Sequence, residues 1–461
     1  MGGASPYARR DNERGPLVAD QPALRRDLGL WHVSTAGVGV ILGAGIYVLI
    51  GVATERAGAV VWGSFVAAAV AVSFTALSYG ELASMFPRAG AGYEYVRQAF
   101  NVHVGFLEGW MTVWAEIIAA AAVALGFGAY LEELTGIDHV TGAIVLLIVG
   151  SFIAASGVLR SVLVVAVLTA AEVGGLLIVS AIGFTDFDPG RLTGDVAVLP
   201  FLSGTALLVF AFLGFEDVAT LAEEAKSPER TIPLAIVISL VFATAVYVTV
   251  AVASVGSIGA EALGEASAPL ATVAAIVLGA RAGDFLALFG MAAAGNTALL
   301  LIMACCRRIY GMASTGAIPP GFARVSGTTR VPVAGLLIVG GIASLMALWG
   351  DIGKVADVTN FALFVAFAAV NLAVIALRLR RPAAPRPFRL PGTVPFVPWK
   401  GVPVIPVLGL LSLALLAANL DRTSTVGGLT LTAVGVVIAV AFRGRRAAAE
   451  RAAYEAESAR T

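Results

Sequence analysis

Charged residues, cysteines and histidines are scarce in this sequence. Of its 461 residues only 13% are charged, whereas 59% are hydrophobic, and the mean hydropathy is +0.91. Soluble domains carry roughly 25% charged residues, so this composition excludes an ordinary soluble protein. It indicates a polytopic membrane protein surrounded by lipid, in which the useful unit of length is an apolar segment of about 20 residues.

The scarce residues also exclude several kinds of site. Cys305 and Cys306, the two cysteines, are adjacent in an apolar segment. Neighbouring cysteines rarely meet disulfide geometry and two ligands are too few for a structural zinc site, so we expect packing residues. The three histidines form no His-Glu-x-x-His pattern, and there is no aspartate-rich diphosphate pattern. The sequence therefore predicts no enzyme, catalytic residue, cofactor or metal site. Its formal net charge of zero gives no indication of a nucleic-acid partner.

Apolar segments long enough to cross a bilayer recur along the chain, and they predict twelve membrane helices. They span residues 31–54, 59–84, 103–131, 140–156, 160–184, 199–221, 232–255, 284–306, 333–350, 355–377, 402–420 and 426–442. A further apolar stretch at 269–279 is too short to span and is predicted to be a helical external loop or a re-entrant piece.

Lysine and arginine determine the expected orientation. With a cytoplasmic N-terminus, 25 of the 30 basic residues fall on the inner side, as the positive-inside rule requires. The five on the outer side are Arg56, Arg191, Arg281, Lys354 and Arg422. We therefore expect a multi-pass plasma-membrane protein whose tails, residues 1–27 and 443–461, are both cytoplasmic.

Two of the predicted membrane helices contain weak points. The segment 36–48 holds four glycines, centred on Gly43 and Gly45, and either opens at that point or allows close helix packing. In the sixth segment, Gly214 is followed within two residues by Glu216. Each segment opens one half of a repeat of five helices, and paired interruptions of this kind are typical of inverted-repeat transporters with a midplane site. Freed N–H groups bind an anion and freed carbonyls a cation, which suits an α-amino acid.

Four stretches resemble signatures of the amino acid–polyamine–organocation permeases, most closely the bacterial amino acid permeases and cationic amino acid transporters. Residues 43–48 (GAGIYV) are similar to the first-helix pattern, and 79–93 (YGELASMFPRAGAGY) to the signature after the second helix, with Ala91 in place of a glycine. Residues 210–216 (FAFLGFE) with 222–233 (AEEAKSPERTIP) resemble the sixth-helix signature. Residues 308–313 (RIYGMA), with Gly316, Pro319 and Pro332, resemble the loop after helix 8.

The resemblance implies an all-α, leucine-transporter-type fold. Ten helices in residues 28–381 would form a 5+5 inverted repeat with discontinuous helices 1 and 6. A cytoplasmic Pro-rich loop, 382–401, and two extra helices in 402–442 would follow. The positions it assigns to substrate binding are Ile41, Leu42, Gly43, Ala44, Gly45, Ile46, Phe210, Ala211 and Gly214.

The resemblance also divides these positions by role. Backbone groups around Gly43, Ala44 and Gly45 would hold the substrate carboxylate. Carbonyl groups near Ile41, Leu42, Phe210 and Ala211 would receive its ammonium group. Phe210 would close over the substrate as a gate, unless it is a packing or lipid-facing phenylalanine.

Three acids are expected at membrane depth, where charges are costly and are functional by default. They are Glu116, Glu172 and Glu216, and each is a candidate for proton coupling. Glu172 takes the place at which many of these permeases have a lysine, so the mechanism of that lysine does not transfer directly. Its alternative role is a structural hydrogen bond to helix 1. Glu81, near the inner end of helix 2, is expected to contact loop groups.

Sodium is less favoured as coupling ion than a proton. The relevant part of helix 8, residues 291–295, lacks the two hydroxyl side chains that sodium-dependent relatives supply, although Asn296 and Thr297 lie one turn further on. The sequence thus predicts an amino acid permease working by alternating access, as proton symporter or exchanger. The alternatives are a polyamine or other organic amine carrier, and a sensor or channel that does not turn over.

Overall fold

The computed structural model describes residues 26–87, 90–156, 162–194, 196–314, 316–326, 331–395 and 400–442. Outside this part of the chain lie nearly all of the two expected tails, together with Arg88 and Ala89 of the second signature. The described residues form an almost entirely helical protein.

The first half contains α1 (Leu30–Ile41), α2 (Gly45–Ala57), η1 (Gly58–Val60), α3 (Val61–Met85), α4 (Ala91–Ala99), α5 (Val102–Thr135), α6 (His139–Ser156), α7 (Val162–Gly183), η3 (Phe184–Asp186) and η4 (Pro189–Leu192), where η marks a 3₁₀ helix. There follow α8 (Val198–Leu208), η5 (Val209–Phe212), η6 (Asp217–Glu223), α9 (Pro228–Ile258), α10 (Ala260–Glu265), α11 (Pro269–Leu278), α12 (Ala280–Ser314), η7 (Pro320–Ala323), α13 (Val333–Ala347), α14 (Ile352–Arg380), β1 (Thr393–Pro395), β2 (Lys400–Pro403), α15 (Val404–Ala417) and α16 (Arg422–Ala441).

Nine helical runs in the described part of the chain are long and apolar enough to cross a membrane. They are Gly45–Met85, Val102–Thr135, His139–Ser156, Val167–Asp186, Val198–Glu223, Pro228–Ile258, Ala280–Ser314, Ile352–Arg380 and Arg422–Ala441. Four shorter apolar helices, α1, α11, α13 and α15, have 10 to 17 residues each. The polytopic membrane protein predicted from composition is confirmed. The count of twelve spans stays a prediction. The expected segments 333–350 and 402–420 correspond to the shorter helices α13 and α15, and the run Gly45–Met85 contains the second expected segment together with the α2 part of the first.

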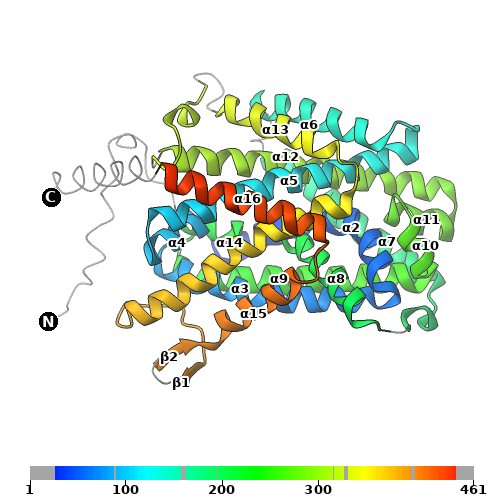
Figure 1. Ribbon diagram of the computed structural model, residues 1–461. Helices are drawn as coiled ribbons and strands as arrows, with labels where there is room; N and C mark the ends of the chain where they lie inside the picture. Colours follow the sequence, from blue (N-terminus) through cyan, green and yellow to red (C-terminus); the bar gives the residue numbers. More distant parts are fainter. Residues whose placement is uncertain are drawn as a thin grey trace.

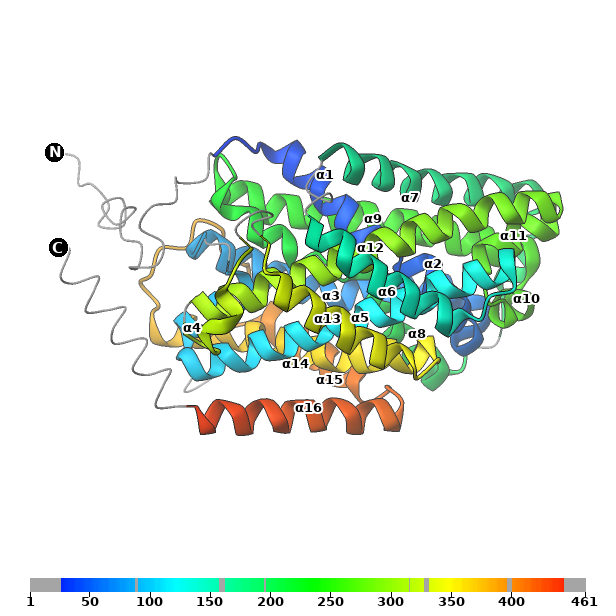
Figure 2. The ribbon, with the colours of Figure 1, turned by 90° about the horizontal axis from the view of Figure 1, so that it is seen from above.

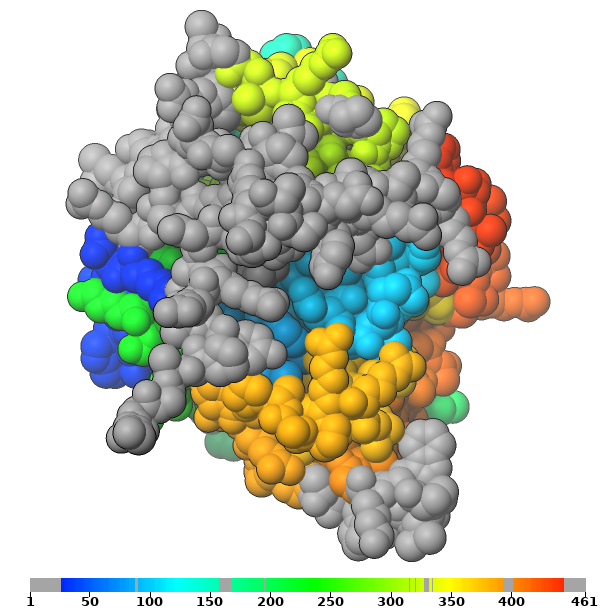
Figure 3. Space-filling view, turned by 90° about the vertical axis from the view of Figure 1, so that its left-hand side faces the viewer, coloured from blue at the N-terminus to red at the C-terminus, as the bar shows by residue number. Residues whose placement is uncertain are grey.

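The long helices lie side by side along one direction (Figures 1 and 2). At one end of the molecule lie α4 and the β1–β2 hairpin, and at the other lie α10 and α11; we call these the α4 end and the α11 end. Helix α5 is central, because 89% of the residues in its most apolar stretch are buried. Helix α16 is peripheral, because only 17% of the corresponding residues are buried. Figure 3 looks onto the α4 end, where α4 and the start of α5 (blue to cyan) lie beside the end of α14 and the segment that follows it (yellow to orange).

Polar side chains determine where several helices begin. Asn101 accepts hydrogen bonds from the N–H groups of His103 and Val104 at the start of α5. Asp351 caps α14 and Asp421 caps α16 in the same way. Each satisfies N–H groups that have no partner inside the helix.

Two local features go beyond the expectations. The apolar stretch at 269–279 is helical, as α11, but it is preceded by the short helix α10. In the Pro-rich loop, β1 pairs antiparallel with β2, with Thr393 opposite Pro403. Pairs of strands this short produce no recognisable alternation of hydrophobic residues, so the sequence did not predict them.

A buried ion pair joins α2 to α14 near the α11 end, where α10 packs on α2. Arg56 Nη2 lies 3.0 Å from Asp357 Oδ2, and Arg56 Nη1 donates to Asp357 Oδ1 at 3.1 Å. The Asp357 side chain is fully buried, whereas that of Arg56 is 21% exposed. The pair therefore connects two helices in a place where an isolated carboxylate would be costly.

We expect Asp357→Ala to lower the free energy of unfolding by about 3 kcal/mol, because it leaves Arg56 without its buried partner. Unfolding of the purified protein in detergent, followed by circular dichroism, measures this loss. Asp186→Ala is the control: its pair with Arg191 is 3.9 Å long and exposed, and such pairs contribute about 0–1 kcal/mol. Equal losses in the two variants would contradict the assignment.

Candidate functional site

Two interrupted helices meet inside the bundle. Helix α1 ends at Ile41 and α2 begins at Gly45, so three residues between them leave the helical path. Helix α8 ends at Leu208 and continues as η5 to Phe212, and η6 begins only at Asp217. Each interruption frees backbone N–H and C=O groups, which inside a membrane protein must find partners.

The two interruptions touch each other. A Cβ atom added to Gly45 would lie 2.7 Å from the Cα atom of Ala211, so only glycine allows this approach. Gly214 has a φ of +109°, a conformation that side chains disfavour, and a Cβ there would meet the side chain of Val40. The glycines that marked both interruptions in the sequence thus also bring them together.

Tyr247, in the middle of α9, links the two interruptions. Its buried hydroxyl lies within hydrogen-bonding distance of the Ile41 carbonyl oxygen and, at 2.9 Å, of the Ala211 carbonyl oxygen. A phenol has one proton to donate, so only one of these carbonyls is satisfied at a time. No sequence motif pointed to Tyr247. The usable signal was a single tyrosine in a long apolar segment, since a buried hydroxyl there needs an acceptor.

Helices α7 and α12 hold the first interruption from the other side. The Ala44 N–H donates to Thr297 Oγ1 at 2.9 Å, so one amide expected at the substrate carboxylate already has a protein partner. Asn296 Nδ2 donates to Glu172 Oε1 at 3.0 Å. The Tyr47 hydroxyl donates to the Glu172 backbone carbonyl at 2.7 Å. Glu172 is thus bound to α2 through its backbone and to α12 through its side chain.

A cavity of about 730 Å³ extends from the interruptions towards the α4 end. At the α4 end its walls include Tyr93 and Glu94 of α4 and Glu223 of η6. The expected site residues that line it are Ile41, Gly43, Ala44, Gly45, Phe210, Ala211, Gly214, Glu116 and Glu216. Leu42, Ile46 and Glu172 are not part of its wall. The structure therefore brings together most of the expected site around one space.

Two of the three membrane acids have polar partners in the cavity wall. Arg308 Nη2 lies 2.8 Å from Glu116 Oε1 and 2.6 Å from Asp217 Oδ1. Glu216 Oε2 accepts the Gly214 N–H at 3.0 Å and so supports the second interruption. Glu172 differs in its position, because it lies outside the cavity wall and its side-chain partner is Asn296 of α12.

The sequence did not predict the pairing of Arg308 with Glu116. These residues are 192 positions apart in the chain, and the signature that contains Arg308 gives no partner. Among the described residues, no three His, Cys, Asp or Glu side chains gather in a way that could hold a metal ion.

Comparisons with known proteins cover nearly the whole chain. A family model described as amino acid permease matches residues 28–442. A branched-chain amino acid permease of Bacillus subtilis is 28% identical over 453 residues, covering 91% of this chain and 94% of the relative. An uncharacterized transporter of Mycobacterium tuberculosis is 32% identical over 437 residues, covering 93% of each chain. Human cationic amino acid transporter 4 is 32% identical over 394 residues, covering 79% of this chain and 62% of the relative.

Removal of the Tyr247 hydroxyl tests whether it supports the interruptions. We expect Tyr247→Phe to lower the free energy of unfolding by about 1–3 kcal/mol, because a buried carbonyl group loses its partner. Thermal unfolding in detergent is the measurement. Tyr310→Phe serves as control, since this half-buried tyrosine takes no part in the contacts at either interruption. Equal effects of the two variants would show that the contacts of Tyr247 contribute nothing specific.

Proposed function

Because the chain belongs to the amino acid permease family, we propose that it is a secondary transporter that carries amino acids across the plasma membrane by alternating access. The resemblance inferred from the sequence signatures is confirmed by the family match, and the protein is a transporter rather than an enzyme. The observation that supports the proposal most strongly is the contact between two interrupted helices at one cavity. This arrangement offers backbone donors and acceptors to the same small solute.

The carboxylate of the substrate would bind at the beginning of α2. The first N–H groups of a helix have no partner inside it and carry the positive end of the helix dipole. Around Gly43, Ala44 and Gly45 these groups adjoin the cavity, and Thr297 already fixes the Ala44 N–H. A bound carboxylate would therefore meet a backbone that is held in place beforehand.

The ammonium group of the substrate would bind at carbonyls of the two interruptions. Tyr247 satisfies either the Ile41 or the Ala211 carbonyl but not both at once, so one remains available to a cation. The other expected carbonyls are less suited, since Leu42 lies outside the cavity wall and the Phe210 carbonyl already accepts the Leu213 N–H at 3.1 Å. The Phe210 side chain, buried in the cavity wall, would cover the bound substrate as a gate, and Gly214 leaves room beside it.

The remaining elements complete a leucine-transporter-type arrangement. We assign residues 28–381 to a ten-helix inverted repeat, 382–401 to a cytoplasmic loop and 402–442 to two further helices, twelve spans in all. Both tails, 1–27 and 443–461, would be cytoplasmic, in line with the excess of basic residues on that side. The β1–β2 hairpin of the loop 382–401 lies at the α4 end (Figure 1), so this end would face the cytoplasm. Because the cavity extends towards the α4 end, it would open towards the cytoplasm.

Counterflow in proteoliposomes tests the proposal. Vesicles preloaded with an amino acid should take up labelled amino acid faster than empty ones, whereas a sensor or channel gives no such stimulation. Gly45→Ala should remove the effect, because its Cβ would collide with the backbone of Ala211. Gly174→Ala on α7, where an added Cβ meets nothing within 4 Å, should preserve it. Stimulation by diamines but not by amino acids would favour the organic amine carrier.

Glu172 is the best of the three candidates for proton coupling. Its side chain is buried outside the cavity wall, and Asn296 Nδ2 donates to its Oε1 atom. Through Asn296 it is one residue removed from Thr297, which holds the Ala44 N–H. Protonation of Glu172 would thus alter its hydrogen bond with Asn296 and, through the neighbouring Thr297, the backbone at the first interruption. Glu116 already pairs with Arg308 and Glu216 with a backbone N–H.

If Glu172 carries the coupled proton, uptake by the wild type should rise as the external pH falls below the internal pH. Glu172→Gln should abolish this dependence, since glutamine fills the same space but cannot take up the proton. Uptake against imposed pH gradients and substrate-driven proton movement measure the effect, with the exposed Glu261→Gln as control. Unchanged pH dependence in Glu172→Gln would disprove the assignment. Replacing sodium by choline at fixed pH tests the competing ion.

A further inference from the structure

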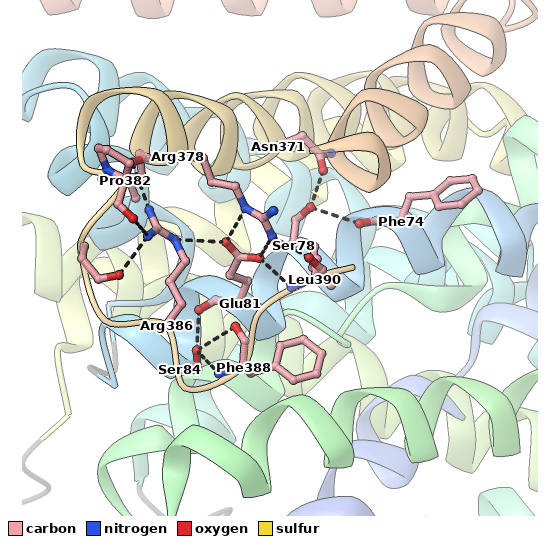
Figure 4. Close-up of polar contacts among 12 residues, drawn as sticks. Phe74, Ser78, Glu81, Ser84, Asn371, Arg378, Pro382, Arg386, Phe388 and Leu390 are labelled. Carbon is pink, nitrogen blue, oxygen red and sulfur yellow. Dashed lines mark hydrogen bonds and ion pairs between the residues drawn. The ribbon is translucent and has the colours of Figure 1, made fainter. Parts of the chain in front are cut away.

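The segment after α14 folds back onto the end of α3 (Figure 4). We call residues 382–391 the strap. Glu81, which was expected to contact loop groups, is the centre of this contact: its carboxylate accepts two hydrogen bonds from Arg378 of α14 and one, at 2.9 Å, from the Leu390 N–H of the strap. Arg386 Nε, also in the strap, lies 3.5 Å from Glu81 Oε1. One buried carboxylate therefore joins α3, α14 and the strap.

Arg386 fastens the strap to the end of α14. Its guanidinium group donates to four backbone carbonyls at distances of 2.9–3.2 Å, as Figure 4 shows in part. These carbonyls belong to Leu377, Arg381, Pro382 and Ala384. The last carbonyls of a helix have no partner inside it and favour a cation, so Arg386 closes the end of α14.

A second group of contacts fastens the strap to α3. The Phe388 N–H donates to Ser84 Oγ at 3.2 Å. A Cβ added to Gly80 of α3 would lie 3.4 Å from the Phe388 ring and 3.3 Å from Pro233 of α9. Phe388 therefore lies against α3 beside Gly80.

The contacts around Glu81 cross between two packed helix pairs. Helix α3 packs along α9, and α14 packs along α5. Alternating access requires parts of the bundle to move relative to one another, so contacts between such pairs either open during the cycle or act as pivots. The burial of a contact indicates whether it opens or acts as a pivot. Glu81 and Arg378 are 1% and 7% exposed and lie outside the cavity wall, so parting them would leave two unpaired buried charges.

The ion pair of Arg308 with Asp217 is in the opposite situation. Its side chains are 18% and 25% exposed and line the cavity, where water can replace the partner as they separate. The pair of Arg308 with Asp217 can therefore open at lower cost than the contacts around Glu81.

We propose that Glu81, Arg378 and the strap form a fixed hinge that keeps the α4 ends of α3 and α14 together while the cavity wall moves. This inference rests on the proposed transport function. It makes Glu81 a positioning residue that touches no substrate and on which turnover nevertheless depends.

A cross-link tests whether the hinge stays closed. Ser84→Cys and Phe388→Cys, joined by a short thiol-reactive linker in a background without Cys305 and Cys306, should leave counterflow intact. The same variants without linker are the controls. Arrest of counterflow on cross-linking, with recovery after reduction of a cleavable linker, would overturn the proposal, because the contact would then have to open. Absence of counterflow in the wild type would instead refute the transport function.

Loosening the hinge is the complementary test. Glu81→Gln should lower counterflow by roughly tenfold or more, since it weakens hydrogen bonds to a buried charge, while substrate still raises the melting temperature. The Ser84–Phe388 cross-link should restore counterflow to this variant. Wild-type counterflow in Glu81→Gln, or no recovery on cross-linking, would contradict a hinge. The cross-link in the wild-type background keeps the proposal testable if Glu81→Gln does not fold.

Discussion

The structure depends on one constraint: backbone polar groups released by an interrupted helix must be paired where water is scarce. The protein meets it with side chains from helices that are themselves continuous. Tyr247 of α9 serves the carbonyls of both interruptions, and Thr297 of α12 serves the Ala44 N–H. Because these partners come from different helices, the position of the site is determined by the packing of the whole bundle.

At the place where a solute would bind, some backbone N–H and C=O groups have no hydrogen-bond partner within the protein. One hydroxyl facing two carbonyls leaves an acceptor free, and the first turn of α2 retains donors that no intrahelical bond uses. A site fully satisfied by the protein would gain nothing from a substrate. The same contacts that stabilise the interruptions therefore also set how much hydrogen bonding remains for a ligand.

The sequence predicted the features that glycine, charge and hydrophobic length report directly. It located both interruptions, because Gly43, Gly45 and Gly214 weaken apolar helices, and it predicted a polytopic membrane protein. It did not predict Tyr247 or the pairing of Arg308 with Glu116, because contacts between residues far apart in the chain depend on how the helices pack. The β1–β2 hairpin was missed for a local reason, since its strands are too short to show a pattern. Glu81 is intermediate: its contact with loop groups was predicted and is confirmed by Leu390, but its partner Arg378 was not identified.

The polar contacts at the α4 end divide by their access to water, and this division bears on how such a protein can move. The contacts around Glu81 are buried, and three hydrogen bonds occupy most of the acceptor sites of the carboxylate. Their separation would leave unpaired charges in an apolar interior. Contacts around Arg308 border a cavity, where a separating ion pair keeps hydrogen-bonding partners. At the α11 end, the buried Asp357 with its partly exposed partner Arg56 lies between these extremes. Mobility in a membrane bundle is then set less by the number of contacts between helices than by whether water can replace them as they break.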